Sequence, residues 1–468
     1  MKKLLLALIT LLLSGSTALV EAQQTQQRSM YERLLQRTDQ PASYIDQIAI
    51  PLTDSTAQVG VFFRIDYDLI PFLRKRPNMT PPNPEDEYFA SLRVGLEIFD
   101  GALPESRRSS RQPATSVFRD SFRDSIWVPN FQLTQSRFDH VQGLLQTNLK
   151  SRDYHYELQL NVGESIRERP SNRRNLSIPN FNNIETAQFI LAESALREDE
   201  KITTKLLNYG NNVLYGQDFD LLIHLPNSVH DNENPIELKF FKFRPASNTE
   251  VISEPSFSLT INQEDLIKAS FQSLRRVDGD LVLSLQKDSE GFTYANVQIP
   301  NSEFENARYR MELTQAGRDK PLARKAINSQ WIDMPVSLYN IDVAIDMMKF
   351  IVSENELRRL RSGSSSEKER KFREFWAERN PTPDTEFNEL MTEYYNRIDI
   401  AYRKFTSAQV PGYDTDQGRT YILHGPPLEV ERRLPTNSPT IEIWEYPNRT
   451  FIFEATTGFG DFKLISEL

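Results

Sequence analysis

At 468 residues the chain is too long for one ordinary domain, and its length alone predicts about three domains. A hydrophobic content of 38% is enough for packed cores, whereas 26% charged residues with a net charge of −10 disfavour a general affinity for nucleic acid and other polyanions. The sequence has no cysteine, which excludes disulfides, thiolate metal sites, cysteine nucleophiles and a lipid anchor on cysteine.

The N-terminus has the three regions of a secretory signal peptide. Lys2 and Lys3 precede an apolar run at residues 4–13, and the small residues that follow fit a cleavage site after Ala22 or after Ala18. The run is too short to cross a bilayer, which takes about 20 apolar residues, so we expect no transmembrane anchor. Residues 1–22 therefore predict export, to the periplasm or to the cell surface or outer membrane, and not as a lipoprotein. The alternative is an N-terminal helix of a cytosolic protein.

Residues 23–44 form a polar lead-in, and strand patterns follow it. Apolar and polar residues alternate along three runs, at 59–67, 90–98 and 154–162. A period of two with one polar face is typical of half-buried antiparallel strands. With turn residues between the runs, the pattern predicts an antiparallel β-sandwich over residues 45–178.

A second set of alternating runs lies further along the chain, at 219–225, 236–240, 281–285 and 309–313. The same reasoning predicts a second antiparallel β-sandwich over residues 183–332. No repeat at the level of single residues relates the two regions, so the sequence does not show whether one is a duplicate of the other.

Two arginine-rich runs, at 107–111 and 167–174, fall between predicted strands of the first region. Charge runs of this kind usually solvate a loop, and that is the ordinary interpretation. The alternative is that they bind anionic glycans or lipid head groups.

After Asn340 the apolar period changes from two residues to the three or four of a helix. Asn340 is a suitable N-cap for a helix that begins at Ile341. Ser366 and Glu369 have the spacing of a capping box, which would open a second helix. Residues 387–405 carry apolar and aromatic side chains at i, i+3, i+4 and i+7, and we expect this third helix to bury that stripe in a core.

Residues 411–427, PGYDTDQGRTYILHGPP, combine turn residues, charges and aromatic side chains. Gly412 and Gly418 frame a turn, in which glycine adopts positive φ without steric cost. We expect the run at 419–423 to be a short buried strand, which the prolines after it end.

Two further strands are predicted at 441–446 and 450–455, joined as a hairpin. With 419–423 they would form a three-stranded antiparallel sheet. The predicted fold is therefore multidomain: two antiparallel β-sandwich domains, followed over residues 335–468 by a small α+β domain with helices packed on that three-stranded sheet.

The stretch around the turn resembles the signature of the GWxTD-domain family, a group of exported bacterial proteins. The matching positions are Gly412, Thr415, Asp416, Gly418 and Arg419. Tyr413 replaces the tryptophan of the family name, and as an amphipathic aromatic residue it is expected to keep the packing role. Ordered motifs from FREFW at 372–376 to GFGDF at 458–462 extend the resemblance over more than a quarter of the chain. The resemblance implies little about activity, because the family has no assigned reaction.

The sequence has five histidines, and none has a second histidine or an acid at a helical zinc spacing, so we predict no metal site. His155 and His224 fall on polar positions of alternating strands, where we expect them at the surface. No glycine-rich phosphate loop follows a strand and opens a helix, so we predict no nucleotide or other cofactor.

His424 differs from these histidines because it lies near Asp414, Asp416 and Arg419 in the sequence. An aspartate that orients its imidazole would give a general base. No motif supplies a matching nucleophile, however. The ordinary interpretation is that Asp416 caps a turn and pairs with Arg419.

Three functional hypotheses follow. The leading hypothesis is an exported cell-envelope protein, non-enzymatic, that binds or scaffolds an envelope protein or glycan and docks through its C-terminal domain. One alternative is a hydrolase of an envelope or extracellular polymer, with Asp416 and His424 as acid–base residues. The other is a carbohydrate-binding module that uses Tyr413, Trp444 and Tyr446. The candidate binding residues are Tyr413, Asp416, Arg419 and His424.

Overall fold

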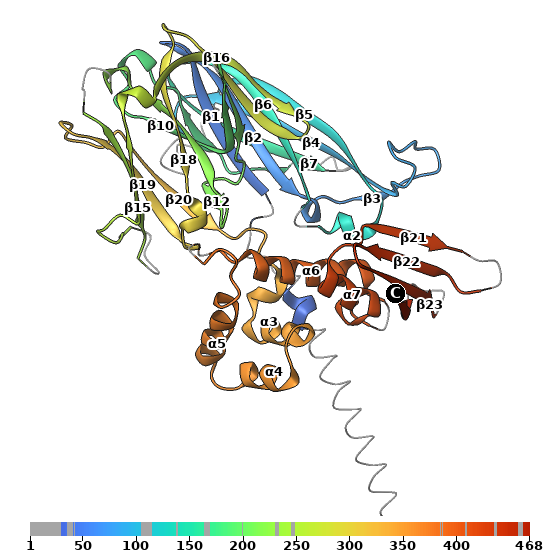
Figure 1. The fold of residues 1–468 in the computed structure, drawn as a ribbon. Helices are drawn as coiled ribbons and strands as arrows, with labels where there is room; N and C mark the ends of the chain where they lie inside the picture. Colours follow the sequence, from blue (N-terminus) through green and yellow to red (C-terminus); the bar gives the residue numbers. More distant parts are fainter. Residues whose placement is uncertain are drawn as a thin grey trace, which may run out of the picture. The chain divides into compact units, whose positions relative to one another are not determined.

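Figure 1 shows a computed structural model of the chain. It describes residues 30–34, 41, 43–103, 115–136, 139–162, 169–198, 200–229, 234–244, 249–383, 385, 387–407, 410–434, 438–456 and 462–468. The chain divides into two compact units. Pro41–Ile332 is called the β-rich unit, and Asp333–Leu468 together with Met1–Gln40 is called the C-terminal unit. The predicted signal peptide at 1–22 and the arginine-rich run at 107–111 lie outside the described residues.

The first part of the β-rich unit contains two sheets. One sheet has the order β1-β2-β6, from β1 (Ser43–Thr53), β2 (Thr56–Asp66) and β6 (His140–Lys150). The other contains β3 (Leu73–Arg74), β4 (Tyr88–Asp100), β5 (Ser116–Val128), β7 (Asp153–Val162), β8 (Arg169–Pro170) and β9 (Arg174–Ser177). Side chains from both sheets share one core, because the apolar residues of β2, β4, β6 and β7 are buried against each other. The three runs predicted here fall within β2, β4 and β7.

The second part of the β-rich unit contains a closed barrel and a five-stranded sheet. The barrel has the order β10-β11-β17-β16-β18-β13, from β10 (Gln188–Arg197), β11 (Lys201–Leu206), β17 (Asp280–Lys287), β16 (Leu266–Val277), β18 (Phe292–Ile299) and β13 (Phe219–Leu225). The sheet has the order β12-β20-β19-β14-β15, from β12 (Asn212–Leu214), β20 (Ala323–Gln330), β19 (Arg308–Gln315), β14 (Ile236–Lys242) and β15 (Phe257–Ile261). The predicted runs fall within β13, β14, β17 and β19.

The two parts of the β-rich unit also share buried side chains. Ile48, Ile50 and Phe62 of the first sheet pack in one cluster with Leu222 and Leu283 of the barrel. Alternation along a strand does not distinguish a barrel from a sandwich, since both bury one face of each strand. The sandwich boundaries at 45–178 and 183–332 therefore stay predictions, whereas the mostly β character of this region is confirmed.

The longer helices lie towards the C-terminus, as predicted: α3 (Ile341–Met347), α4 (Glu354–Arg361), α5 (Ser365–Ala377) and α6 (Glu389–Phe405), with the short helices η7 (Val336–Tyr339) and η8 (Met348–Phe350) beside them. Residues 30–34 and α2 (Phe131–Thr134) add short helical segments earlier in the chain. Asn340 caps α3 by accepting from two backbone N–H groups of its first turn. The capping box of α5 is formed by Ser364 and Glu367, and so precedes the predicted pair of Ser366 and Glu369. No helix in the part of the chain that the structure describes has the length and apolar character needed to cross a membrane.

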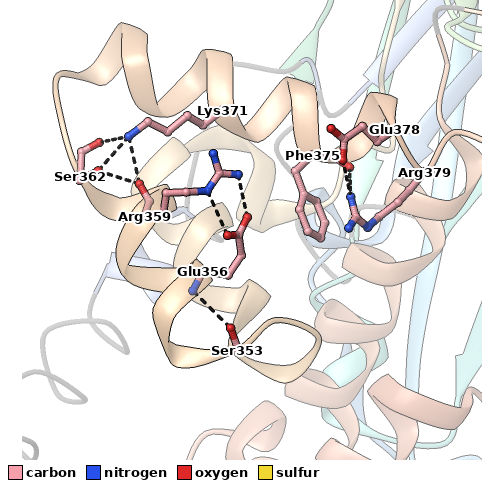
Figure 2. A network of polar contacts seen from close by, with 8 residues as sticks. All are labelled: Ser353, Glu356, Arg359, Ser362, Lys371, Phe375, Glu378 and Arg379. Carbon is pink, nitrogen blue, oxygen red and sulfur yellow. Dashed lines mark hydrogen bonds and ion pairs between the residues drawn. The ribbon is translucent and has the colours of Figure 1, made fainter.

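Polar side chains fix the turn between α4 and α5, as Figure 2 shows. Lys371 Nζ on α5 donates to the backbone carbonyl oxygens of Arg359 at 3.0 Å and Ser362 at 2.8 Å. The last carbonyls of a helix have no partner within the helix, so this ammonium group satisfies the end of α4. After α5, the guanidinium carbon of Arg379 lies 3.7 Å from the ring centroid of Phe375. These contacts hold the helices in register around the apolar core.

The long helix α6 buries its aromatic stripe, as predicted. Tyr394 and Tyr395 are buried, and their hydroxyls donate to the carbonyl oxygens of Met347 at 2.5 Å and Ala344 at 2.8 Å. A buried hydroxyl needs such a partner, since losing its water without compensation is costly. The two hydrogen bonds therefore join α6 to α3 while the rings fill the core between them.

The predicted strand at 419–423 is wrong, because these residues belong to a helix, α7 (Asp416–His424). A short apolar run fits a buried strand and a buried helical turn equally well. Thr415 caps the start of this helix and Gly425, with φ 78°, ends it. The flanking residues therefore decide for a helix.

The predicted three-stranded sheet is correspondingly a four-stranded one, in the order β21-β22-β23-β24. Its strands are β21 (Glu429–Arg433), β22 (Ile441–Tyr446), β23 (Arg449–Ala455) and β24 (Phe462–Glu467). The two central strands match the predicted hairpin. In Figure 1, α6 and α7 lie on the side of this unit nearer the sheet, and buried Tyr421 of α7 packs with Trp444 and Phe453 of the sheet.

Candidate functional site

The two glycines of the signature permit close backbone contacts. A Cβ on Gly412 would lie 2.1 Å from the carbonyl oxygen of Ala401 on α6, and a Cβ on Gly418 would lie 1.7 Å from the carbonyl oxygen of Gly412. Neither glycine has φ in the left-handed region, so the predicted reason for them, a turn with positive φ, is wrong. They are required because the short helix η9 (Gly412–Asp414) is pressed between α6 and α7.

The Thr-Asp pair of the signature positions the start of α7. Thr415 Oγ1 accepts from the N–H of Gly418 at 3.0 Å and donates to the carbonyl oxygen of Gly412 at 2.8 Å. Asp416 Oδ2 accepts from the N–H of Leu464 at 3.0 Å, which ties the helix to β24. An acid in the first turn also has a favourable interaction with the helix dipole. Both side chains are therefore engaged in holding helix and sheet together.

Tyr413 is a core residue, with 1% of its surface exposed. Its ring stacks on Tyr402 at a centroid distance of 5.9 Å and meets Tyr31 edge-on at 5.5 Å. Lys349 Nζ lies 5.4 Å from the same ring and pairs with Asp414 at 2.5 Å. The predicted packing role of Tyr413 therefore matches its position.

The rings that the carbohydrate-binding hypothesis uses do not form an open platform. Tyr413 and Trp444 are buried, and Tyr446 is partly buried with its hydroxyl donating to the carbonyl oxygen of Gly425 at 2.8 Å. A sugar stacks on the face of an exposed ring, and neither buried ring offers one. The structure thus gives this hypothesis no support.

His424 and Asp416 occupy opposite ends of α7. With a rise of 1.5 Å per residue, the two backbones are about 12 Å apart along the helix. The His424 ring packs on Phe451 at 5.1 Å between centroids, and burial together with nearby Arg449 lowers its pKa. Arg419 is exposed on the same helix. The acid–base pair of the hydrolase hypothesis is therefore not assembled.

A buried glutamate joins α7 to the sheet. Glu442 Oε2 accepts from Gln417 Nε2 at 2.6 Å and from Trp444 Nε1 at 3.3 Å, and its Oε1 accepts from Arg432 Nε at 2.7 Å. Both carboxylate oxygens are thus occupied by donors, one of them charged. A carboxylate held in this way fixes the position of α7 on the sheet. In the sequence, the only sign of Glu442 was its place in an alternating strand.

The N-terminal segment contributes a residue to the C-terminal unit that the sequence did not predict. Residues 30–34 are helical, and Tyr31 is fully buried beside α6. Its hydroxyl donates to Asp399 Oδ1 at 2.5 Å, and Asp399 Oδ2 accepts from the N–H of Val336 at 2.8 Å. Tyr31 falls in the polar lead-in predicted at 23–44, where no motif marks a buried residue.

Burial dominates the electrostatics of this pair. Desolvation raises the pKa of the Asp399 carboxyl to about 6, although the hydrogen bonds from Tyr31 and Val336 oppose the rise. Burial and the neighbouring Asp399 raise the pKa of the Tyr31 hydroxyl, which therefore stays a neutral donor. The pair sits inside the apolar core that contains Tyr413.

The two strand histidines predicted at the surface are buried. His155 stacks on Phe99, and its Nδ1 lies 2.8 Å from the carbonyl oxygen of Gly101. His224 is surrounded by Phe181, Phe292 and Tyr294, and burial lowers its pKa to about 4. Alternation fails here because these strands are covered on both faces. Within the described ranges, no three His, Asp or Glu side chains gather as metal ligands would.

Residues 327–461 match the family described as the GWxTD domain. The matched range contains every helix from η7 to α7 and three of the four strands of the small sheet. A comparison with curated proteins gave no match.

Proposed function

Because the C-terminal part of the chain is a GWxTD domain, we propose that the protein is an exported cell-envelope protein that acts as a binding or scaffolding module and docks through this domain. The observation that supports a non-enzymatic role is that the signature residues are engaged in structure. Gly412 and Gly418 allow the close packing of η9, Thr415 caps α7, and Asp416 holds β24. No acid–base pair is left over among them.

The edge of the small sheet supports docking as the function of this domain. All five residues of β21 are exposed, and among the strands that the structure describes it pairs with β22 alone. Leu428 and Leu434 flank it with 75% and 76% of their surfaces exposed, and Val430 lies between them at 50%. An exposed edge strand can pair with a strand of another protein, while its apolar side chains contact that partner.

In this proposal the β-rich unit supplies two sandwich-like modules that extend the binding surface or act as a spacer. The predicted signal peptide at 1–22 supports export, to the periplasm or to the cell surface or outer membrane. Mass spectrometry of the purified protein tests that part, because a mature N-terminus at Gln23 is expected. Retention of Lys2 and Lys3 in the envelope-associated protein would contradict it.

Docking is tested by affinity capture from envelope fractions with the full chain and its Val430→Asp variant. We expect the variant to keep its fold, since Val430 is half exposed, and to lose the partners that the parent chain captures. The matched control is Leu196→Asp, which places the same charge on an exposed leucine of β10. Docking through β21 is rejected if both variants capture the same partners as the parent.

A further inference from the structure

A polar pocket of about 630 Å³ lies within the β-rich unit. Its lining comes from strands far apart in the sequence: Asp46 on β1, Tyr156 on β7, Arg174 on β9 and Lys325 on β20. We call it the Lys325 pocket. Its volume is in the range of sites that hold small organic molecules.

The cations of the Lys325 pocket exceed its acids. Arg174, Arg324 and Lys325 line it, and Asp46 is the one carboxylate among its lining residues. Arg324 is neutralised outside the pocket by Glu312, which accepts from its Nε at 2.8 Å and from its second nitrogen at 3.2 Å. Two cations therefore face one acid.

Contacts within the protein leave hydrogen-bond donors of both Arg174 and Lys325 available to a ligand. Arg174 donates one N–H to the backbone carbonyl oxygen of Ile45 at 2.7 Å, and its charge acts on Asp46 and Tyr156, but it forms no ion pair with a carboxylate of the described residues. The Lys325 ammonium has no hydrogen-bond acceptor among the described residues, and Asp46 acts on it only at longer range. Asp46 is itself occupied by the N–H of Gly210, at 2.7 Å.

Lys325, Asp46 and Tyr156 are partly withdrawn from water in the pocket. Burial lowers the pKa of the Lys325 ammonium, which Asp46 only partly offsets, and burial raises the pKa of the Asp46 carboxyl. Burial raises the pKa of the Tyr156 hydroxyl to about 12, so it remains a neutral donor next to Arg174. A partly desolvated ammonium without a close counter-ion destabilises the folded chain unless a bound anion pairs with it.

We propose that the Lys325 pocket binds the anionic group of a small hydroxylated molecule, a carboxylate or a phosphate carried on a sugar-like body. Arg174 and Lys325 contact the anion, and the Tyr156 hydroxyl donates to it. The amides of Gln188 and Asn175, which also line the pocket, suit the hydroxyl groups of such a ligand. Arginine forks match the geometry of carboxylate and phosphate oxygens, which is why the charge centre is placed there.

This inference is independent of docking through β21. It selects one part of the arginine-rich run at 167–174, namely Arg174, and gives it a role that the charge run alone did not define. It also differs from the family signature, since every residue of the Lys325 pocket lies outside residues 327–461.

The test uses the full chain and three probes: glucuronate, glucose 6-phosphate and neutral glucose, each titrated by calorimetry at low salt. Binding of at least one anionic probe, with glucose weaker by about tenfold or more, is expected. The comparison of the two anionic probes shows whether carboxylate or phosphate is preferred. If glucose binds as tightly as both anions, or if none of the three binds at millimolar concentration, the proposal is overturned.

The variants locate the binding. Arg174→Gln should weaken the anionic probe about tenfold or more, and Arg174→Lys should recover part of the loss. Arg74→Gln is the matched control, because Arg74 on β3 is an exposed arginine that pairs with Glu87 and does not line the pocket, and its effect should stay within about twofold. Equal losses in both Gln variants would place binding elsewhere on the surface. Circular dichroism of each variant establishes that the chain is folded.

Discussion

The C-terminal unit and the Lys325 pocket treat buried charge in different ways. In the C-terminal unit, Glu442 has donors on both carboxylate oxygens and Asp399 is held by Tyr31 and a backbone N–H. In the Lys325 pocket the ammonium of Lys325 lacks a close acceptor within the described ranges, and Arg174 spends one N–H on a carbonyl. Glu442 and Asp399, in the region with the family signature, therefore have hydrogen-bond donors on both carboxylate oxygens, whereas Lys325, outside that region, keeps donors that a ligand could use. A recognisable sequence motif can reflect packing requirements, while a candidate binding site can lie in a region without any motif.

The largest expected effect tests how tightly the signature is packed. Gly418→Ala places a Cβ 1.7 Å from the carbonyl oxygen of Gly412, so we expect a loss of about 3 kcal/mol or more in the free energy of unfolding. Urea denaturation followed by tryptophan fluorescence measures it. Gly95→Ala is the control, because a Cβ there would meet its nearest atom at 3.6 Å. Similar losses in both variants would show that the close approach at Gly418 is not the cause.

The second effect concerns pH and Asp399. Its carboxyl has a pKa of about 6 in the folded chain against the ordinary 3.8, so the folded state binds the proton more tightly than the unfolded state. Stability from this group is therefore complete below about pH 4 and is lost as the pH rises to about 6, by roughly 2–3 kcal/mol. Thermal unfolding between pH 4 and pH 7 should show a decline that Asp399→Asn removes. A decline of the same size in the variant would assign it to other groups.

A smaller effect tests the attachment of the N-terminal segment. Tyr31→Phe keeps the ring but removes the donor to Asp399 Oδ1, so we expect a loss of about 1–3 kcal/mol. Hydrogen exchange should also quicken at residues 30–34. Tyr402→Phe is the control, because its hydroxyl contacts Glu32 at 3.2 Å in a less buried position. A larger loss in Tyr402→Phe than in Tyr31→Phe would contradict the ranking.

The smallest expected effect on stability concerns Arg174, in the Lys325 pocket. Arg174→Gln should change the free energy of unfolding by no more than about 0.5 kcal/mol, because Arg174 is exposed and holds only a carbonyl. The same variant should lose anion binding. If stability falls by as much as in Tyr31→Phe, Arg174 is a structural residue and the contrast between the two regions disappears.

The strands with one polar face and the helix α6 were predictable, because a buried face leaves a regular period in the sequence. The strand β21 was not, since all five residues of EVERR are exposed and no apolar period exists to detect. The strand predicted at 419–423 was wrong because three apolar residues are too few to show whether their period is that of a strand or of a helix. Thr415 and Gly425, as cap and terminator, carried the decisive information.

The candidate sites were less predictable than the fold. Tyr31 and Asp399 are separated by 368 positions, and neither residue type marks a partner at that distance. The Lys325 pocket likewise brings together residues of five strands, and only Arg174 belonged to a run that the sequence singled out. The signature glycines were found at once, but their reason, close approach rather than positive φ, required the neighbouring carbonyl oxygens of Ala401 and Gly412.

The burial of Tyr31 beside α6 has a consequence for the order in which the chain folds. Residues near the start of a chain leave the ribosome first, yet the core that buries this tyrosine includes α6, near the end. Closing so long a loop is slow and entropically costly, so this contact forms among the last. In a product that ends before α6, residues 30–34 would lack part of the core that buries Tyr31. An exposed N-terminal segment of this kind is a preferred site of proteolysis.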